Sequence, residues 1–408
     1  MNAKSSQANW QNRPLTDVLD FQEGPGIMAR DFREDGVPLI RIAGLKRGAK
    51  LLAGCDYLAE EMVLQRWDHF RLRHGDVLLS TSASLGEIAT VDVSAVGAIA
   101  YTGIIRFRPK SNEVLADFIP HALRAPSFGR QIEAMGTGSV IKHFGPTHLR
   151  QMTIVLPPAP EQQAIAEVLG ALDDKIAVNE RIAESTIDLA EAMYVHKSSS
   201  GQGWHGTPLA ETARWLSGGT PKTSEPSYWD GDIPWISAAS LKSPWIDDSD
   251  RRVTALGAES GTRLVPPGTI VFIVRGMSLT SEFRIGLTQR EVAFGQDCKA
   301  LIPRPGIDST TLFLAIKTRT PEILGFVDLA GHGTGRLATD RIAQLAVKLP
   351  EGAAAEEFSQ TVVPLMQRAS ATKQENRALT TLRNTLLPQL LTGKLRIKDA
   401  ERTVEEAV

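Results

Sequence analysis

The sequence contains little cysteine and no long apolar run, and both absences narrow the possible classes of protein. Cys55 and Cys298 are the only cysteines in 408 residues, and neither has a metal-ligating neighbour, so we expect free thiols rather than disulfides or a zinc site. No apolar run approaches the ~20 residues that a membrane helix needs. Residues 1–14 lack the apolar core of a secretion signal. These absences predict a cytoplasmic protein with no membrane span.

An excess of positive charge is also lacking. The formal net charge is −2, from 45 Lys and Arg against 47 Asp and Glu. This balance argues against a wholly basic protein that coats DNA, but it is compatible with a local basic face. An apolar share of 42% is ordinary for a globular protein, and the length predicts two or three domains.

Motifs of catalysis are missing as well. The sequence has no Gly-x-Ser-x-Gly elbow, no His-Glu-x-x-His and no four-ligand Cys/His cluster. Neither Pro-Pro pair follows the Asn or Asp that a methyltransferase of base amines would carry. The nearest match to a nuclease motif, Asp297-Cys298-Lys299, lacks the second acidic residue. We therefore predict no catalytic residue and no metal site in this chain.

The stretch GGTPKTSEPSYWDGDIPWIS, residues 218–237, has the composition of a phosphate-binding loop but not its order. Such a loop needs glycine before the lysine and a helix directly after it, because the helix N-terminal amides hold the phosphates. Here Pro221 precedes Lys222 and removes a backbone N–H. Glu225-Pro226 then disfavours a helix start. The stretch therefore predicts a loop that leads into a strand.

The chain repeats once along its length. Pro38 recurs in the second half as Pro234, within a similar run of residues. Each half later carries a glycine turn, GTGS at residues 136–139 and GTGR at residues 333–336. Each turn is followed by a strand that ends in Leu-Pro and then by a long polar–apolar helix. This common order predicts a tandem duplication.

The two helices that follow Leu-Pro are expected at residues 160–197 and 354–387. Their apolar positions step by three and four, as in a coiled coil, and polar Asn179 and Asn376 interrupt them at matching places. An ordinary core helix would also give an apolar stripe, but these stripes are long, thin and interrupted. We predict an intramolecular antiparallel coiled coil with the seam residues Leu169, Leu172, Ile176, Asn179, Met193, Leu365, Asn376 and Leu379.

Loops at corresponding places in the two halves are the candidates for nucleic-acid contacts. Glycine allows a backbone to approach a phosphate, and Ser, Thr, Arg and Lys side chains donate to phosphates and base edges. The alternative is that these loops are only solvated connections. The candidate DNA-binding residues are Ser80, Ser82, Ser84, Gly138, Ser139, Lys142, His143, Arg275, Ser278, Thr280, Thr334, Gly335, Arg336 and Arg341.

Three stretches together resemble the DNA specificity subunit of type I restriction–modification systems. They are residues 218–237, LPPAPEQQAIAEVLGALDDKIAVNERI at residues 156–182, and LRNTLLPQLLTGKL at residues 382–395. The resemblance implies two target-recognition domains held apart by two antiparallel helices, each domain reading one half of a split site on double-stranded DNA. It implies no catalysis by this chain. It also implies two methyltransferase partner subunits that use S-adenosylmethionine, and restriction or translocase subunits that use ATP and Mg.

The resulting expectation is an α+β protein built from two tandem mixed α/β target-recognition domains and two long antiparallel coiled-coil helices, related by a pseudo-twofold internal duplication. We expect the first domain at residues 1–157 and its helix at 158–200, then the second domain at 201–350, its helix and a hook at 351–398, and a disordered tail at 399–408. A coiled-coil scaffold with non-DNA cargo and a self-contained DNA-modifying enzyme remain as alternatives.

Overall fold

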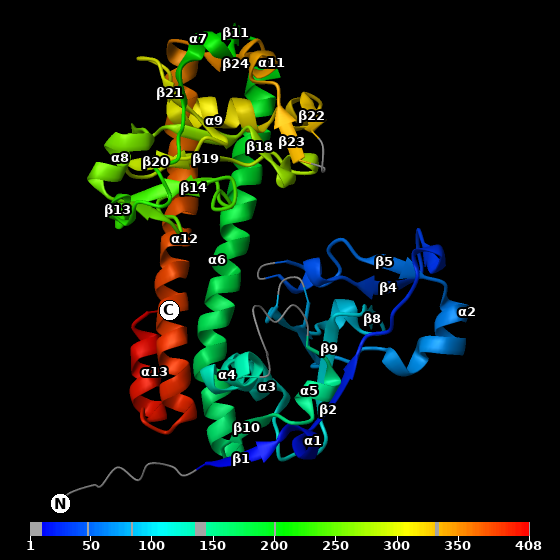
Figure 1. Cartoon of the computed structure of the whole chain (residues 1–408). Helices are drawn as coiled ribbons and strands as arrows, with labels where there is room; N and C mark the ends of the chain where they lie inside the picture. The colour runs from blue at the N-terminus through cyan, green and yellow to red at the C-terminus, as the bar shows by residue number, and fades with distance from the viewer. Residues whose placement is uncertain are drawn as a thin grey trace, which may run out of the picture. The chain divides into compact units, whose positions relative to one another are not determined.

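The computed structural model of the chain describes residues 10–46, 49–82, 85–134, 144–199, 201–330 and 334–407. These residues divide into two compact units (Figure 1). Unit 1 comprises Met1–Arg181 and Lys373–Val408, and unit 2 comprises Ile182–Thr372. No helix within the described ranges is both long and apolar enough to cross a membrane.

Unit 1 contains two four-stranded sheets and a two-stranded ribbon. The first sheet is antiparallel, in the order β2 (Leu19–Glu23), β9 (Ile104–Pro109), β6 (Val77–Ser80) and β7 (Ile88–Thr90). The second has the order β3 (Phe32–Arg33), β5 (Asp56–Leu58), β4 (Val37–Ile40) and β8 (Ile99–Ala100), and its β4–β8 pair is parallel. The ribbon pairs β1 (Gln11–Pro14) with β10 (Thr153–Leu156).

Unit 2 uses the same plan with extra strands. Its first sheet has the order β12 (Ala213–Ser217), β21 (Cys298–Pro303), β17 (Ile270–Ile273), β19 (Ile285–Thr288) and β14 (Trp245–Ile246). Its second has the order β15 (Arg252–Val253), β13 (Trp229–Ile236), β20 (Val292–Phe294) and β16 (Leu264–Val265). Its ribbon pairs β11 (Trp204–Pro208) with β24 (Ala346–Pro350). A third sheet joins β18 (Arg275–Gly276), β23 (Thr334–Leu337) and β22 (Val327–Ala330).

Strand register confirms the predicted internal duplication. Leu19 lies opposite Pro109 in unit 1, and Ala213 lies opposite Pro303 in unit 2. The strand pairing of unit 1 is thus repeated in unit 2, with both strands displaced along the chain by the same number of residues. The parallel pair between β4 and β8 recurs as the parallel pair between β13 and β20. A repeated register requires a repeated backbone path, and each unit is therefore one copy of the same fold.

Short helices connect the strands and cover the sheets. In unit 2, Asp308 begins α9 by accepting a hydrogen bond from the Thr311 backbone N–H through its carboxylate, as N-cap residues do. The short helices are α1 (Leu15–Val18), α2 (Glu60–Met62), α3 (Ile119–Arg124), α4 (Pro126–Ala134), α5 (Pro146–Leu149), α7 (Leu209–Thr212), α8 (Ala255–Gly261), α9 (Ser309–Lys317), α10 (Thr320–Leu324) and α11 (Thr339–Ala343).

Two long helices follow the ribbons, as the sequence predicts. Helix α6 (Ala159–Ser199) has 41 residues and α12 (Ala353–Leu391) has 39. Both are longer than expected, because α6 runs past Lys197 and α12 runs into the predicted hook. Helix α12 continues through Pro364 and Pro388, although proline lacks the N–H of the helical ladder. It ends before Gly393, whose positive φ of 65° suits a glycine that closes a helix.

The C-terminal tail is not disordered as expected. Residues Ile397–Glu405 form a further helix, α13, beside the C-terminal end of α12 (Figure 1). Its residues Ala400 and Val404 are buried in the core of unit 1 together with Leu390 of α12. The expectation failed because the charged composition of the tail hid an apolar spacing of three and four residues, which marks one buried helix face.

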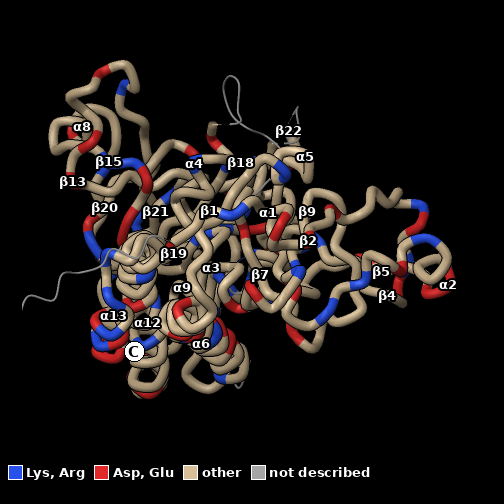
Figure 2. Tube along the Cα trace, turned by 90° about the horizontal axis from the view of Figure 1, so that it is seen from below, with Lys and Arg blue, Asp and Glu red and all other residues tan. Residues whose placement is uncertain are grey.

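Apolar burial fixes the long helices within each unit. In unit 1, Ile165, Leu169 and Leu172 of α6 join Leu379 of α12 in a core that also contains Phe107 of the first sheet. In unit 2, the buried residues of the helices are Ala190, Tyr194, Phe358, Val362, Met366 and Ala369, and they share a core with the sheet of that unit. Both helices carry charged residues of both signs (Figure 2).

Candidate nucleic-acid interface

The stretch at residues 218–237 is a braced loop and strand. The indole N–H of Trp235 donates to the Gly219 carbonyl oxygen at 3.1 Å, and that of Trp229 donates to the Lys222 carbonyl oxygen at 3.2 Å. The two indole rings pack edge to face, with centroids 5.4 Å apart. Both tryptophans therefore anchor the loop as packing residues.

Strand pairing in unit 2 brings two of the candidate loops together. Strand β18 pairs with β23 so that Arg275 lies opposite Arg336 and Gly276 lies opposite Gly335. Ser278 and Thr280 follow directly in a short 3-10 helix, Met277–Thr280, which packs on β23 through buried Leu279. The sequence placed these residues in separate loops, and the structure joins them at one end of the unit.

Gly335 is needed for this close approach. A Cβ atom at this position would lie 2.7 Å from the Leu279 Cβ and 3.1 Å from a methyl carbon of Val327. The first distance is shorter than real Cβ contacts, so any side chain here would push the 3-10 helix away from β23. The role of Gly335 is therefore to permit packing beneath Arg336, and it is itself buried.

The remaining candidates of unit 2 differ in exposure. Arg341 lies on α11 and is exposed. Thr334 is half-buried at the start of β23. The Thr280 hydroxyl donates to the Met277 carbonyl oxygen at 2.8 Å, which uses its hydrogen within the 3-10 helix. Arg341 and the two strand arginines are thus the candidates of unit 2 with the most available donors.

Fewer of the candidate DNA-binding residues of unit 1 lie in the described part of the structure. Ser80 is fully buried, and its hydroxyl oxygen accepts a hydrogen bond from the Glu87 backbone N–H at 2.9 Å. It supports the loop and has no surface for a DNA contact, which corrects the prediction for this residue. Ser82 is half-buried at the end of β6. Five further candidates lie outside the described residues, namely Ser84, Gly138, Ser139, Lys142 and His143.

An equivalent backbone hydrogen bond nevertheless lies beside the candidate loop in each unit. In unit 1 the Phe144 N–H donates to the Thr81 carbonyl oxygen, and in unit 2 the Leu337 N–H donates to the Val274 carbonyl oxygen at 2.9 Å. Thr81 and Val274 directly precede Ser82 and Arg275. The structure therefore places Ser82 of unit 1 where unit 2 has Arg275.

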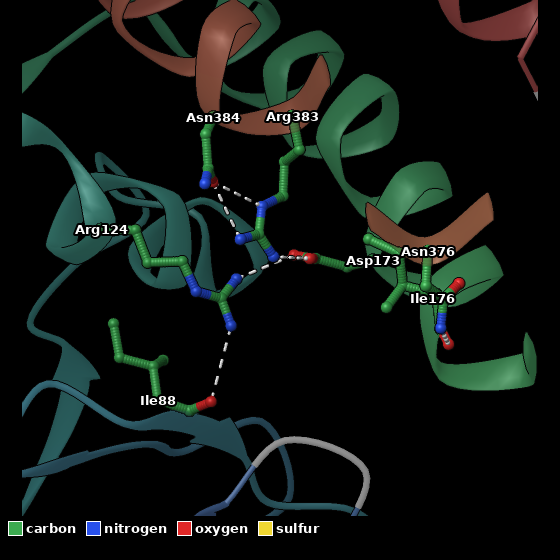
Figure 3. Close-up of polar contacts among 7 residues, drawn as sticks. All are labelled: Ile88, Arg124, Asp173, Ile176, Asn376, Arg383 and Asn384. Carbon is green, nitrogen blue, oxygen red and sulfur yellow. Dashed lines mark hydrogen bonds and ion pairs between the residues drawn. The ribbon is translucent and has the colours of Figure 1, made fainter. Parts of the chain in front are cut away.

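Asp173 of α6 joins three elements of unit 1 (Figure 3). One carboxylate oxygen lies 2.8 Å from the Arg124 guanidinium on α3, and the other lies 2.6 Å from the Arg383 guanidinium on α12. Two guanidinium partners hold the pKa of the Asp173 carboxyl below its usual range, against the opposing effect of burial. Arg124 also reaches the Ile88 carbonyl oxygen of β7 at 3.5 Å. This ion-pair cluster fastens the first sheet and α3 of unit 1 to the long helices α6 and α12.

An open cleft of about 790 Å³ borders this cluster between α6 and the β7–α3 region of unit 1. His121 lines the cleft but is only 5% exposed. Burial lowers the pKa of His121 to about 4, and the nearby arginines act in the same direction. The imidazole is therefore neutral at pH 7, and Asp173 keeps its two arginine partners.

The predicted seam residues lie between the helices to different degrees. Leu169, Leu172, Ile176, Asn179 and Leu379 are buried in unit 1, whereas Met193 and Leu365 are half-buried in unit 2. The Asn179 side-chain amide donates to the Asn376 amide oxygen at 2.9 Å, and the Asn376 amide donates to the Ile176 carbonyl oxygen at 3.0 Å. The two asparagines that interrupt the apolar pattern thus satisfy each other across the helix pair.

A family model described as the type I restriction modification DNA specificity domain matches this chain twice, at residues 7–185 and 202–380. The chain belongs to this family. Each matched specificity domain contains one set of sheets and the first part of the long helix that follows it. The repeating element is therefore a recognition fold together with its own helix.

Curated relatives of the family match over shorter segments. The specificity subunit of the type I restriction enzyme EcoR124I/EcoR124II from Escherichia coli is 27% identical over 144 residues, which are 35% of this chain and 36% of that protein. The HindI specificity subunit from Haemophilus influenzae is 22% identical over 198 residues, 48% of this chain and 42% of that protein. The chain thus matches less than half the length of these relatives.

A solved structure in the same family has a similar fold along almost the whole chain. The S subunit of a type I restriction–modification system from M. genitalium aligns with a TM-score of 0.54 and 18% identity, covering 96% of this chain and 98% of the other. In the part of this specificity chain that the structure describes, no group of His, Cys, Asp and Glu side chains is arranged to hold a metal ion.

Proposed function

We propose that this chain reads a bipartite sequence on double-stranded DNA, with one half-site contacted by each specificity domain. The proposal rests on the double family match over two units whose equivalent strands pair in the same order. Two copies of one frame carry different side chains at corresponding loop positions, such as Ser82 and Arg275. Different loops on a shared frame are suited to reading two different half-sites.

We further propose that the chain performs no chemistry itself and directs partner subunits to the site. The named relatives are specificity subunits of type I restriction enzymes. In this proposal two methyltransferase subunits bring S-adenosylmethionine, and restriction or translocase subunits bring ATP and Mg. The complex would act on DNA in the cytoplasm. No observation favours a scaffold for other cargo or a self-contained enzyme.

A domain exchange tests this function. Residues 1–157 of this chain are replaced by the corresponding segment of a relative, which keeps β1 and its partner β10 together. Each chain is produced in cells with the methyltransferase partner, and methylated bases are located by single-molecule sequencing. We expect one half of the methylated sequence to change and the other half to stay. A change in both halves, or methylation without any bipartite sequence, would contradict the proposal.

A further inference from the structure

Two arginine side chains lie directly opposite one another on the exposed β18–β23 strand pair of unit 2. Arg275 and Arg336 are register partners, and both are exposed. Side chains at such positions have Cβ atoms about 5 Å apart, and like charges placed there destabilise the sheet. The fold thus holds two positive charges close together at an energetic cost.

One carboxylate lies beside the pair and offsets part of this repulsion, but neither guanidinium forms an ion pair among the described residues. Asp328 of β22 lies opposite Arg336 on its other side, yet it makes no ion pair with it. The Asp297 backbone oxygen accepts from the Arg275 N–H at 3.4 Å, but the Asp297 side chain is not paired with the guanidinium. Both guanidinium groups therefore keep their donors available to an external anion.

We infer that Arg275 and Arg336 form a clamp for one phosphate of the DNA backbone. The inference rests on the proposed function and adds to it the ligand group and the two residues that hold it. A phosphodiester bound between the arginines would neutralise their repulsion and accept from both guanidinium forks. The bound phosphate would thus convert the repulsion between the two arginines into attraction of both to one anion.

The sheet that carries the arginine pair also exposes apolar side chains. Met277, which follows β18, is 73% exposed, and Leu329 of β22 is 71% exposed. Leu329 lies opposite Gly335, so its side chain points to the face of the sheet away from Arg275 and Arg336. The row formed by Arg275, Arg336 and Asp328 therefore has a face of its own, on which both guanidinium groups are exposed.

The clamp belongs to one half of the molecule. Unit 1 has Ser82 at the place of Arg275, as the equivalent backbone hydrogen bonds of Thr81 and Val274 show. The shared fold therefore does not require an arginine at this place, and the side chain of Arg275 is free to serve a contact of unit 2 alone.

The test uses the full chain assembled with its methyltransferase partner. Affinity is measured against salt concentration on duplex DNA that carries the methylated site and on unrelated duplex DNA. We expect Arg275→Ser and Arg336→Ser each to weaken both DNAs by the same factor. The double variant should lower the slope of log affinity against log salt by about 0.9 in total, and neither single variant should lower it by more, because the two side chains share one phosphate. Arg275→Lys and Arg336→Lys should keep the wild-type slope, because the charge remains.

Arg304 provides the matched control. Arg304 is exposed and directly follows β21. Because β21 runs antiparallel to β17, Arg304 lies at the opposite end of the sheet from Arg275. Arg304→Ser should therefore leave affinity and slope unchanged. The melting temperature of Arg275→Ser should be equal to or above that of the wild type, since its repulsion with Arg336 is removed.

Three results would overturn the clamp. Unchanged slopes would place the arginines away from DNA, and a loss confined to one base pair would make them readers of a base edge. A fall in melting temperature that parallels the loss of affinity would give them a structural role. Failure of the wild-type complex to prefer its methylated site would instead refute the proposed function.

Discussion

At the scale of single residues, Asp173 shows how the two copies solve one problem differently. Asp173 pairs with Arg124 and Arg383 in unit 1. One repeat further on, in unit 2, stands Ser370, whose hydroxyl donates to the Gln289 side-chain oxygen at 3.2 Å. Lys317 of α9 also pairs with Glu191 of α6 in unit 2 at 2.9 Å. Both copies therefore use an ion pair between a short helix and α6, but the carboxylate stands at a different place on α6 in each.

We predict that Asp173→Asn lowers the free energy of unfolding by about 1–3 kcal/mol, because it leaves two neighbouring guanidinium groups without their shared carboxylate. Urea unfolding at pH 7 measures the change. Asp174→Asn is the control, since this neighbouring carboxylate is exposed. The pKa of Asp173 is lowered in the fold, so its contribution is present above the unfolded pKa of ~3.9 and is lost as pH falls through the folded pKa. Equal effects of the two variants would contradict the prediction.

At the scale of elements, the α6–α12 pair is specified by a polar contact within an apolar seam. Asn179 donates to Asn376 and also to the Glu375 carboxylate at 3.0 Å. A single polar layer in a coiled coil costs stability but fixes the register of the helices. The apolar residues on either side would tolerate a shifted register, whereas the asparagine pair satisfies its hydrogen bonds in only one.

We therefore predict opposite effects for single and double replacements of this pair. Asn179→Leu should destabilise unit 1 by about 1–3 kcal/mol, because the Asn376 side-chain oxygen loses its donor at a half-buried site. Asn179→Leu combined with Asn376→Leu should recover that loss or exceed it. A double-mutant cycle in urea measures both. Additive losses in the double variant would show that the asparagines do not act as a pair.

At the scale of the whole molecule, the boundary between the two units falls inside both long helices, after Arg181 in α6 and after Thr372 in α12. Each helix is continuous across its boundary. The family model likewise ends each match inside a long helix. Each helix therefore belongs to both specificity domains. Under the proposed function, its length would set the length of the unread spacer between the two half-sites.

We predict that inserting four residues after both Arg181 and Thr372 lengthens the unread spacer of the methylated sequence by about two base pairs. Four helical residues add about 6 Å, and DNA rises ~3.4 Å per base pair. A seven-residue insertion keeps the heptad phase and adds about three base pairs. Single-molecule sequencing of methylated DNA gives the spacer directly. An assembled variant that methylates at the original spacing would show that the helices do not measure the DNA.

Local signals in the sequence predicted much of this architecture. The apolar spacing of α6 and α12 and the matching asparagines depend on residues close together in the chain, where helical preferences act directly. The same kind of signal was present in the tail. Its spacing of Ile397, Ala400 and Val404 indicates the helix that the charged composition concealed. The predicted glycine turn at residues 333–336 was wrong in its described part, because Thr334–Leu337 form strand β23, and the turn at residues 136–139 lies outside the described residues.

The sequence by itself determined the two copies, the long helices and the residue types available for DNA. Only the tertiary structure decided which of these residues meet. It placed Arg275 opposite Arg336, buried Ser80 beneath its loop, and joined Asp173 to Arg383 of a distant helix. Strand register and helix packing are fixed by the burial of whole apolar faces, so contacts between residues far apart in the chain follow from the complete fold rather than from any local pattern.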